Sequence, residues 1–278
     1  MKPVNYFNGQ FVEKDQIHIS VDNVAFLRGY GVFEFFKVHG EQPLFMEDHL
    51  NRLFRSAEGM NLSVPLSKER ISEIVFELIR RNQMPYSSMK IILSGGNSKD
   101  GFTPGEPELI VLNAPFSDVA DAAYETGESL MLYAYHRDFP KIKSLYYATT
   151  VALQSEWKGK GHIDVLYHNG DEISEVSRSN VFLFKNGKLK TNQEDVLSGI
   201  TRMHVLKAAH PHFETIVDTI KLQELLDADE VFITSSSKKV LPIVKLDEKL
   251  IGNGKPGPLT KRMVEIFDQY IQDYLAKA

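Results

Sequence analysis

Apolar residues in the first part of the chain follow two periods, an alternation typical of strands and a spacing typical of helices. Aromatic-rich runs flank Asn8-Gly9 and His39-Gly40, and such glycine-bearing pairs between short apolar runs predict β-hairpins. Apolar side chains recur at helical spacing over residues 46–62, and Ser67 opens a second helical pattern. The other predicted strands of this part are residues 88–96 and 107–115.

A second mixture of strands and helices follows a segment of small and acidic residues. That segment, residues 116–128, has little apolar pattern and is the predicted linker. We therefore expect an N-terminal α/β domain at 1–115 and a C-terminal domain at 129–278. Within the latter, a helix is predicted directly after Lys143, and 180–191 is predicted as one strand. Further strands are predicted at 129–136, 162–169 and 229–236, and further helices at 201–210, 221–228 and from Pro258 onward.

Composition narrows the class of protein without naming a function. The 278 residues are 42% hydrophobic and 25% charged, with a net charge of −5 and a pI of about 6.0, so we expect no basic field for nucleic acid or an acidic membrane. The chain has no cysteine, which excludes disulfides, thiolate chemistry and cysteine-based metal sites. Its histidines show no metal-ligand spacing, so no metal is predicted.

Two negative features bear on location. The N-terminus lacks the apolar region of a signal peptide. The chain also lacks a run of about 18 apolar residues, the length that spans a membrane. The sequence therefore predicts a cytoplasmic protein with no membrane partner.

Two lysines, Lys141 and Lys143, precede the helix predicted after residue 143. Either lysine can be an ordinary solvated charge beside the start of a helix. The alternative is chemical, because the positive end of a helix disfavours an ammonium group. Such an amine has a lowered pKa and attacks an aldehyde more readily.

Charged and polar groups that could hold an anion recur along the chain. Glu175 is predicted on a polar, serine-rich loop, and Gly199 precedes a helix start whose N–H groups can bind an anion. Residues 233–239 run from a strand into consecutive serines, and Arg52 or Arg55 on the helix at 46–62 can clamp a phosphate. Taken singly, each has an ordinary explanation as a hydrated loop, a helix cap, a polar turn or a solvated arginine.

Taken together, these groups match what pyridoxal phosphate requires. The cofactor needs a lysine for a Schiff base, an anion cradle for its phosphate and a partner at its pyridine nitrogen. A carboxylate in that last place keeps the nitrogen protonated, so that the ring accepts electrons from the substrate Cα.

The motifs and their order resemble the class IV (fold type IV) pyridoxal-phosphate-dependent aminotransferases. This group includes branched-chain aminotransferase, D-amino acid aminotransferase and aminodeoxychorismate lyase. The resemblance covers nearly the whole chain through DNVAFLRGYGVFEFFKV, HLNRLFRSAEGM, IKSLYYATTVAL, EISEVSRSNVFLF, VLSGITR and the segment from DEVFITSSSKK onward. It implies a two-domain α+β (mixed α/β) fold, with a smaller N-terminal α/β domain and a larger C-terminal domain that has a barrel-like sheet. It also implies that pyridoxal 5'-phosphate lies between the domains of a homodimer.

The resemblance implies a role for each matched residue. Lys143 forms the Schiff base and moves protons between the substrate and the cofactor, and Glu175 pairs with the pyridinium. Tyr147 corresponds to a tyrosine that hydrogen-bonds the phenolic oxygen of the cofactor in branched-chain enzymes. The implied phosphate contacts are Arg52, Ile200, Thr201 and Ser236 with Ser235 beside it, and Leu197 packs on the ring face.

The predicted substrate pocket departs from that of the D-amino acid aminotransferases. Phe33 stands where those enzymes carry a tyrosine, and their arginine near the SGG stretch is missing here. Glu34 follows Phe33 as in the aminotransferases, whereas the lyases tend to have threonine. Arg28 and Tyr30 are further candidate pocket residues, and Arg28 is a candidate partner for a substrate carboxylate.

The sequence therefore predicts a transaminase that moves an amino group from a branched-chain or similar apolar L-amino acid to a 2-oxo acid. Aminodeoxychorismate lyase, which releases 4-aminobenzoate and pyruvate, is the alternative, together with D-amino acid aminotransferase. A non-catalytic phosphate-binding protein on the same scaffold is a third hypothesis, from another class of function.

Overall fold

The computed structural model describes residues 2–277 and divides the chain into two units. Unit 1 comprises Met1–Ser117 and Ile142–Tyr147, and unit 2 comprises Asp118–Lys141 and Ala148–Ala278. The chain therefore returns to unit 1 for a short stretch, and that stretch contains Lys143.

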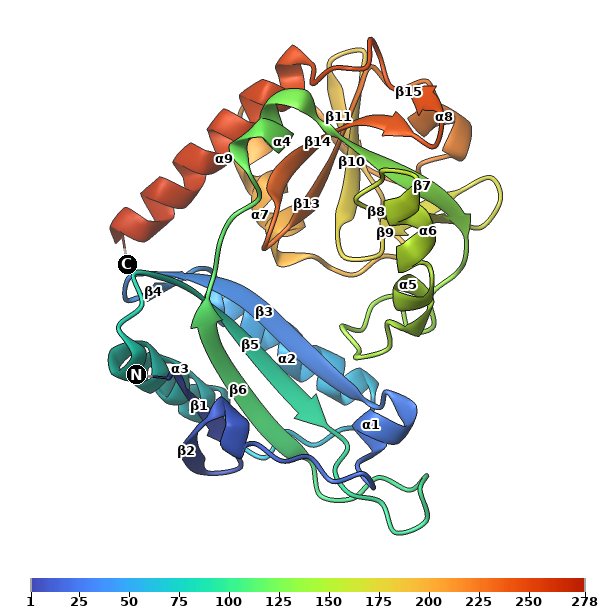
Figure 1. Ribbon diagram of the computed structural model, residues 1–278. Coiled ribbons are helices and arrows are strands. Elements are labelled where there is room, and N and C mark those ends of the chain that lie inside the picture. The colour runs from blue at the N-terminus through green and yellow to red at the C-terminus, as the bar shows by residue number, and fades with distance from the viewer. Residues whose placement is uncertain (1, 278) are drawn as a thin grey trace. The chain divides into compact units, whose positions relative to one another are not determined.

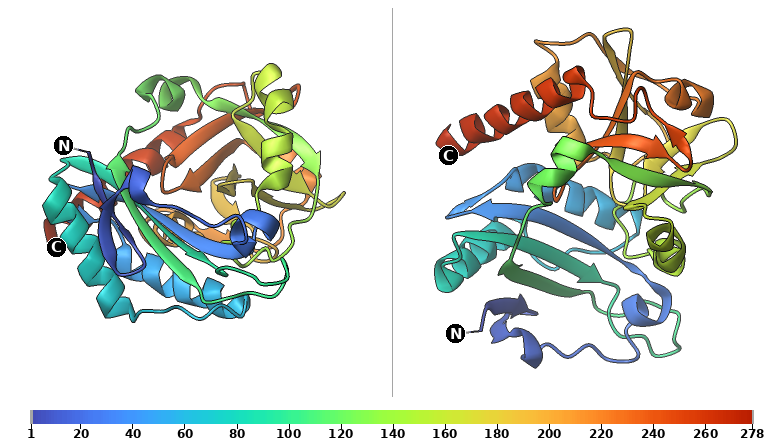
Figure 2. Two further views of the ribbon diagram at one scale, coloured as in Figure 1. Left: turned by 60° about the horizontal axis from the view of Figure 1, so that its bottom comes forward. Right: turned by 45° about the horizontal axis from the view of Figure 1, so that its top comes forward.

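Unit 1 is built on a six-stranded sheet with two long helices on one face (Figures 1 and 2). The strand order is β2-β1-β6-β5-β3-β4. The strands are β1 Val4–Phe7, β2 Gln10–Glu13, β3 Gly31–His39, β4 Gln42–Pro43, β5 Tyr86–Ser94 and β6 Glu108–Pro115. The helices are α1 Val24–Arg28, α2 Met46–Gly59 and α3 Lys68–Asn82, with a 3-10 turn at Lys14–Gln16.

Alternation along β3 decides which of its side chains face α2 and α3. Val32, Phe36 and Val38 are fully buried and belong to the apolar cluster that these helices cover. Glu34 has the same parity, so the strand carries a carboxylate into this buried layer. Phe33 and Phe35 have the opposite parity and are only half-buried.

Unit 2 is built on a nine-stranded, curled sheet. The order is β12-β11-β10-β13-β14-β7-β8-β9, with β15 paired to β14, and the last strand β9 also contacts β10. This return of the sheet edge onto its middle confirms the expected barrel-like sheet and the mixed α+β class. The strands are β7 Glu128–Ala134, β8 Asp164–His168, β9 Ile173–Val176, β10 Asn180–Lys185, β11 Lys188–Thr191, β12 Thr215–Val217, β13 Glu230–Ser235, β14 Lys239–Leu246 and β15 Lys249–Leu250. The helices are α4 Asp121–Thr126, α5 Ala148–Ala152, α6 Gln154–Gly159, α7 Ile200–Ala209, α8 Leu222–Leu226 and α9 Pro258–Lys277.

The two faces of the unit 2 sheet bury different residues. Val181, Leu183 and Ile233 point into one apolar cluster. The alternate positions carry aromatic rings, and Phe182 stacks on Phe232 at 4.9 Å between ring centres. Asn180 shares the parity of Phe182, which places it on the aromatic face.

Three local predictions are wrong. Residues 180–191 are not one strand, because Asn186-Gly187 adopts positive φ values of 50° and 76° and turns the chain between β10 and β11. Glu175 lies on strand β9 and not on a polar loop. The helix expected directly after Lys143 begins only at Ala148.

Over residues 2–277, no helix combines the length and the apolar character needed to cross a membrane.

Candidate active site

The short segment 142–147 of unit 1 runs along the edge of β3 and fixes the backbone of Lys143. Phe33 N–H donates to the Lys143 carbonyl at 3.0 Å, and Leu145 N–H donates to the Gly31 carbonyl at 2.9 Å. Lys143 N–H donates to Ser56 Oγ on α2 at 3.3 Å. A non-helical segment with one bridge to β3, between Ser144 and Val32, therefore replaces the start of the predicted helix. The helix-dipole argument made for Lys143 from the sequence does not apply.

The side chains of Lys143 and Tyr147 contact the same aromatic ring. Lys143 Nζ lies 4.5 Å from the centre of the Phe33 ring, a distance at which a cation is attracted to the ring face. Tyr147 meets Phe33 edge to face, with ring centres 5.9 Å apart. Unit 1 thus brings together three of the residues that the sequence singled out.

Arg52, a predicted phosphate contact, is held by the carboxylate of Glu34. Its Nε lies 2.7 Å from Glu34 Oε1 and its Nη2 lies 2.8 Å from Oε2, so the guanidinium makes a bidentate hydrogen-bonded pair with the carboxylate. His49 Nδ1 lies 2.7 Å from Glu34 Oε2, and the three side chains are all at least nine-tenths buried. The two bonds from Glu34 fix the plane and direction of the arginine.

The pKa values of Glu34 and His49 are both lowered in this cluster. Burial by itself would raise the pKa of Glu34, but the Arg52 guanidinium and the hydrogen bond to His49 hold it at about 2, against an ordinary 4.5. Burial lowers the pKa of His49 below its ordinary 6.5, although Glu34 opposes this. Glu34 is therefore ionised and His49 neutral at neutral pH.

Unit 1 should lose stability as the pH falls below about 6.5. An unfolded chain takes up protons on His49 below 6.5 and on Glu34 below 4.5, whereas the folded unit resists both, so both contributions are lost toward acid pH. The lowered pKa of Glu34 contributes roughly 3 kcal/mol to the free energy of unfolding at neutral pH.

We expect Glu34→Gln to lower the free energy of unfolding by about 3–5 kcal/mol at neutral pH, because Arg52 is left buried without its carboxylate.

Urea unfolding at neutral and acid pH measures this difference. The difference in free energy of unfolding between wild type and Glu34→Gln should become smaller as the pH falls. A difference that stays the same at every pH would contradict the proposed ionisation of Glu34. Glu73→Gln is a matched control, because Glu73 pairs with Arg70 at 2.6 Å on the exposed face of α3. Its effect should stay below about 1 kcal/mol at any pH.

Unit 2 gathers its predicted site residues around Asn180. Leu197 N–H donates to Glu175 Oε2 at 3.0 Å, and Asn180 Nδ2 donates to the Leu197 carbonyl at 2.9 Å. Asn180 pairs across the sheet with Thr234, immediately before Ser235. One asparagine therefore links the loop at Leu197, strand β10 and the start of the serine turn.

The start of α7 lies against the same asparagine. A Cβ on Gly199 would lie 2.0 Å from Asn180 Oδ1, so only glycine lets the chain pass here. Gly199 is the N-cap residue of α7 and has no side chain with which to cap it, and Ile200 and Thr201 begin the first turn. Backbone N–H groups at such a helix start can bind an anion.

The serine turn after β13 is closed by its own hydroxyls. Ser235 Oγ lies 3.2 Å from Ser237 Oγ and accepts from Lys238 N–H at 3.2 Å, and Ser236 is half-buried between them. Lys238, which sequence reasoning missed, points its Nζ to within 3.5 Å of Ser179 Oγ. Burial lowers the pKa of Lys238 to about 8.

The other residues that the sequence singled out make different contacts. Arg28 is exposed and donates to the Leu27 carbonyl at 2.9 Å. The Tyr30 hydroxyl donates to the Met60 carbonyl, which ties it to the end of α2. Lys141 is exposed and pairs with Glu194 at 2.8 Å, as expected of a solvated charge. Over residues 2–277, no group of three or more histidines and carboxylates could hold a metal ion.

Glu175 also has a partner that sequence reasoning missed. The Arg137 guanidinium donates from Nη1 to Glu175 Oε1. The local sequence YHRDFP is typical of an ordinary polar loop, and a contact across 38 positions leaves no periodic signal.

Comparison with known proteins places these residues in a family. The model of the amino-transferase class IV family matches residues 31–246. A Methanocaldococcus jannaschii protein, provisionally named a branched-chain-amino-acid aminotransferase, is 30% identical over 94% of each chain. A D-alanine aminotransferase of Staphylococcus aureus is 26% identical over 97% of this chain and 98% of its own. The crystal structure of the T.th. branched-chain amino acid aminotransferase with pyridoxamine 5'-phosphate superposes with a TM-score of 0.89 at 23% identity, over 98% of this chain and 94% of that one.

Proposed function

We propose that this chain, which belongs to the class IV aminotransferase family, is a transaminase that uses pyridoxal 5'-phosphate and takes a branched-chain or similar apolar L-amino acid as donor. The observation that carries the donor class is the packing of Lys143 and Tyr147 on Phe33. A phenyl ring beside the reactive amine offers an apolar surface and no hydroxyl for a substrate carboxylate.

The residues present fit the proposed cofactor. Unit 1 holds an amine beside an aromatic ring and a buried guanidinium oriented by a carboxylate. Unit 2 holds the buried carboxylate Glu175 and the start of helix α7, which follows Gly199. The structurally similar T.th. enzyme is described with pyridoxamine 5'-phosphate, which supports the same cofactor here.

We assign the following roles under this proposal. When bound, pyridoxal phosphate supplies an aldehyde that captures the amino group and a protonated ring that draws electrons from the Cα atom. Lys143 Nζ would move the Cα proton of the substrate to the C4′ carbon of the cofactor, and Glu175 would hold the proton at the ring nitrogen. Tyr147 would donate to the phenolic oxygen of the cofactor, and Leu197 would cover its ring face. The phosphate would be bound by Arg52, Ile200, Thr201, Ser235 and Ser236.

A panel of donors tests the proposal. Purified protein should be yellow, and L-leucine, L-isoleucine and L-valine should react with 2-oxoglutarate faster than D-alanine does. Phe33→Tyr is the matched variant, because it adds one hydroxyl to the apolar wall. It should lower kcat/KM for the branched-chain donors by about 10-fold or more. A higher rate with D-alanine than with every L-donor would overturn the donor class. Release of pyruvate and 4-aminobenzoate from aminodeoxychorismate, with no transamination, would identify the lyase alternative.

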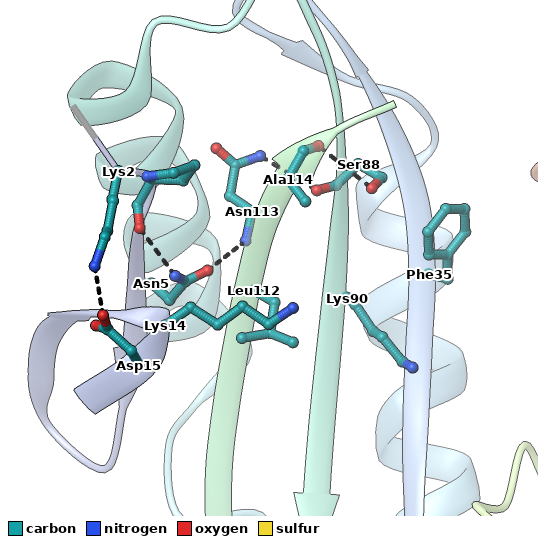
Figure 3. A pocket seen from close by; sticks show the side chains of 11 residues that line it. Lys2, Asn5, Lys14, Asp15, Phe35, Ser88, Lys90, Leu112, Asn113 and Ala114 are labelled. Carbon is teal, nitrogen blue, oxygen red and sulfur yellow. Dashed lines mark hydrogen bonds and ion pairs between the residues drawn. The ribbon is translucent and has the colours of Figure 1, made fainter. Parts of the chain in front are cut away.

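The subunit arrangement is part of the same proposal. The sheet face of unit 1 opposite α2 and α3 carries half-buried Phe35 and Leu112, and it is hollowed by a cavity of about 740 Å³ that they line with Ser88, Lys90 and Ala114 (Figure 3). The lining also includes Lys2, Asn5, Lys14, Asp15 and Asn113, and a face that combines apolar with polar side chains can be covered by a second subunit. We therefore infer a homodimer, while the cytoplasmic location stays a prediction of the sequence.

A further inference from the structure

Both oxygens of the Glu175 carboxylate are held by the protein. Arg137 Nη1 donates to Oε1, and Leu197 N–H donates to Oε2 at 3.0 Å. The side chains of Arg137 and Glu175 are only 10% and 4% exposed. The pair is therefore a largely desolvated guanidinium–carboxylate contact.

The surroundings of Glu175 are positive beyond this contact. Burial lowers the pKa of Arg202, in the first turn of α7, and the charge of Glu175 partly offsets that lowering. Arg202 donates from Nη2 to the Asn192 carbonyl at 2.5 Å and from Nε to Thr191 Oγ1 at 3.4 Å. Two guanidinium groups thus favour the ionised form of Glu175, Arg137 by a direct hydrogen bond and Arg202 through its charge.

We propose that Arg137 is a positioning residue that keeps Glu175 ionised and oriented, so that the shared proton stays on the pyridine nitrogen of the cofactor instead of moving to the carboxylate. This inference rests on the proposed function, in which Glu175 faces that nitrogen. A proton between a buried carboxylate and a pyridine nitrogen has two positions, on nitrogen as an ion pair or on oxygen as a neutral pair. A guanidinium bonded to the carboxylate stabilises its charge and therefore favours the proton on nitrogen.

The inference predicts different results for two substitutions at one position. Arg137→Met keeps much of the volume and removes the charge, so Glu175 should become more basic and take the proton. Arg137→Lys keeps the charge and loses only the fork geometry, so most of the effect should be rescued. Arg178→Met is the control, because Arg178 also pairs with a buried carboxylate, 3.0 Å from Asp164, although its own side chain is 48% exposed.

Two measurements test these expectations. In cofactor-free protein, the 13C resonance of the Glu175 carboxyl, identified by its absence in Glu175→Gln, should titrate at least about one pH unit higher in Arg137→Met than in wild type. In protein reconstituted with 15N-pyridoxal phosphate, the ring-nitrogen resonance should move toward the unprotonated position in Arg137→Met. Arg137→Lys should stay near wild type in both measurements, and Arg178→Met should be unchanged.

The two measurements separate the inference from the proposed function. Wild-type protein that binds no pyridoxal phosphate would remove the proposed function, and the carboxyl titration would still report on Arg137 and Glu175. An unchanged carboxyl titration or an unchanged ring-nitrogen resonance in folded Arg137→Met would overturn the inference. With the proton lost from the ring nitrogen, kcat should fall by about 10- to 100-fold while KM changes little.

Discussion

Lys143→Ala should lower turnover by at least about 1,000-fold, because it removes the amine that captures the cofactor and moves the Cα proton. The fold should survive. The segment that carries Lys143 is held by backbone bonds, Phe33 N–H to the Lys143 carbonyl and Leu145 N–H to the Gly31 carbonyl, and alanine keeps both. Steady-state rates and a circular-dichroism spectrum of the variant would measure the two effects separately.

Lys141→Ala provides the control for this prediction. Lys141 lies two positions away, is exposed and pairs with Glu194, so its removal should change the rate by less than about 2-fold. Borohydride reduction of the yellow protein should fix the cofactor on the peptide that contains Lys143, and the Lys143→Ala protein should carry no label. A label on Lys141, or turnover retained in Lys143→Ala, would refute the assignment.

Elements with a strong local signal are predicted well from the sequence. The Asn8-Gly9 hairpin forms β1 and β2, and the apolar spacing over 46–62 forms α2. Ser67 caps α3 by accepting from Arg70 N–H at 3.2 Å. In each case, the residues that determine the element are neighbours in the chain.

Predictions fail where distant contacts decide the local structure. The residues after Lys143 have a helical pattern, but Ser144 bridges to Val32 on β3, and the first helical residue is Ala148. The polar neighbours of Glu175 predict a loop, yet β8 pairs with its strand and buries it. Tertiary pairing overrides propensity at both positions.

The residues that hold the predicted site residues in place are the hardest to predict from the sequence. From the sequence, Glu34 is only a marker of the aminotransferases, although the parity of Val32, Phe36 and Val38 places it in the buried layer with Arg52. Its role in holding the arginine explains why a carboxylate suits this position. Arg137 carries no such parity signal, and only the folded chain brings it to Glu175.

Glu175→Gln should lower kcat by roughly 100- to 1,000-fold, because the amide cannot hold a proton at the ring nitrogen as an ion pair. Glutamine keeps the size of the side chain, and its carbonyl oxygen can still accept from Leu197 N–H, so cofactor binding should persist. Pre-steady-state absorbance of the reconstituted variant would separate binding from the chemical step. A wild-type rate would count against the pairing of Glu175 with the pyridinium.

The double variant Glu175→Gln/Arg137→Met completes the test, because the two residues are proposed to act through one proton. Glu175→Gln leaves Arg137 buried without its carboxylate, which should cost stability, and removal of Arg137 as well should restore part of it. The rates should not be additive: once Glu175 is neutral, Arg137 has no carboxylate to keep ionised, and its loss should change kcat little further. Independent losses that multiply in the double variant would show that Arg137 acts on the reaction by another route.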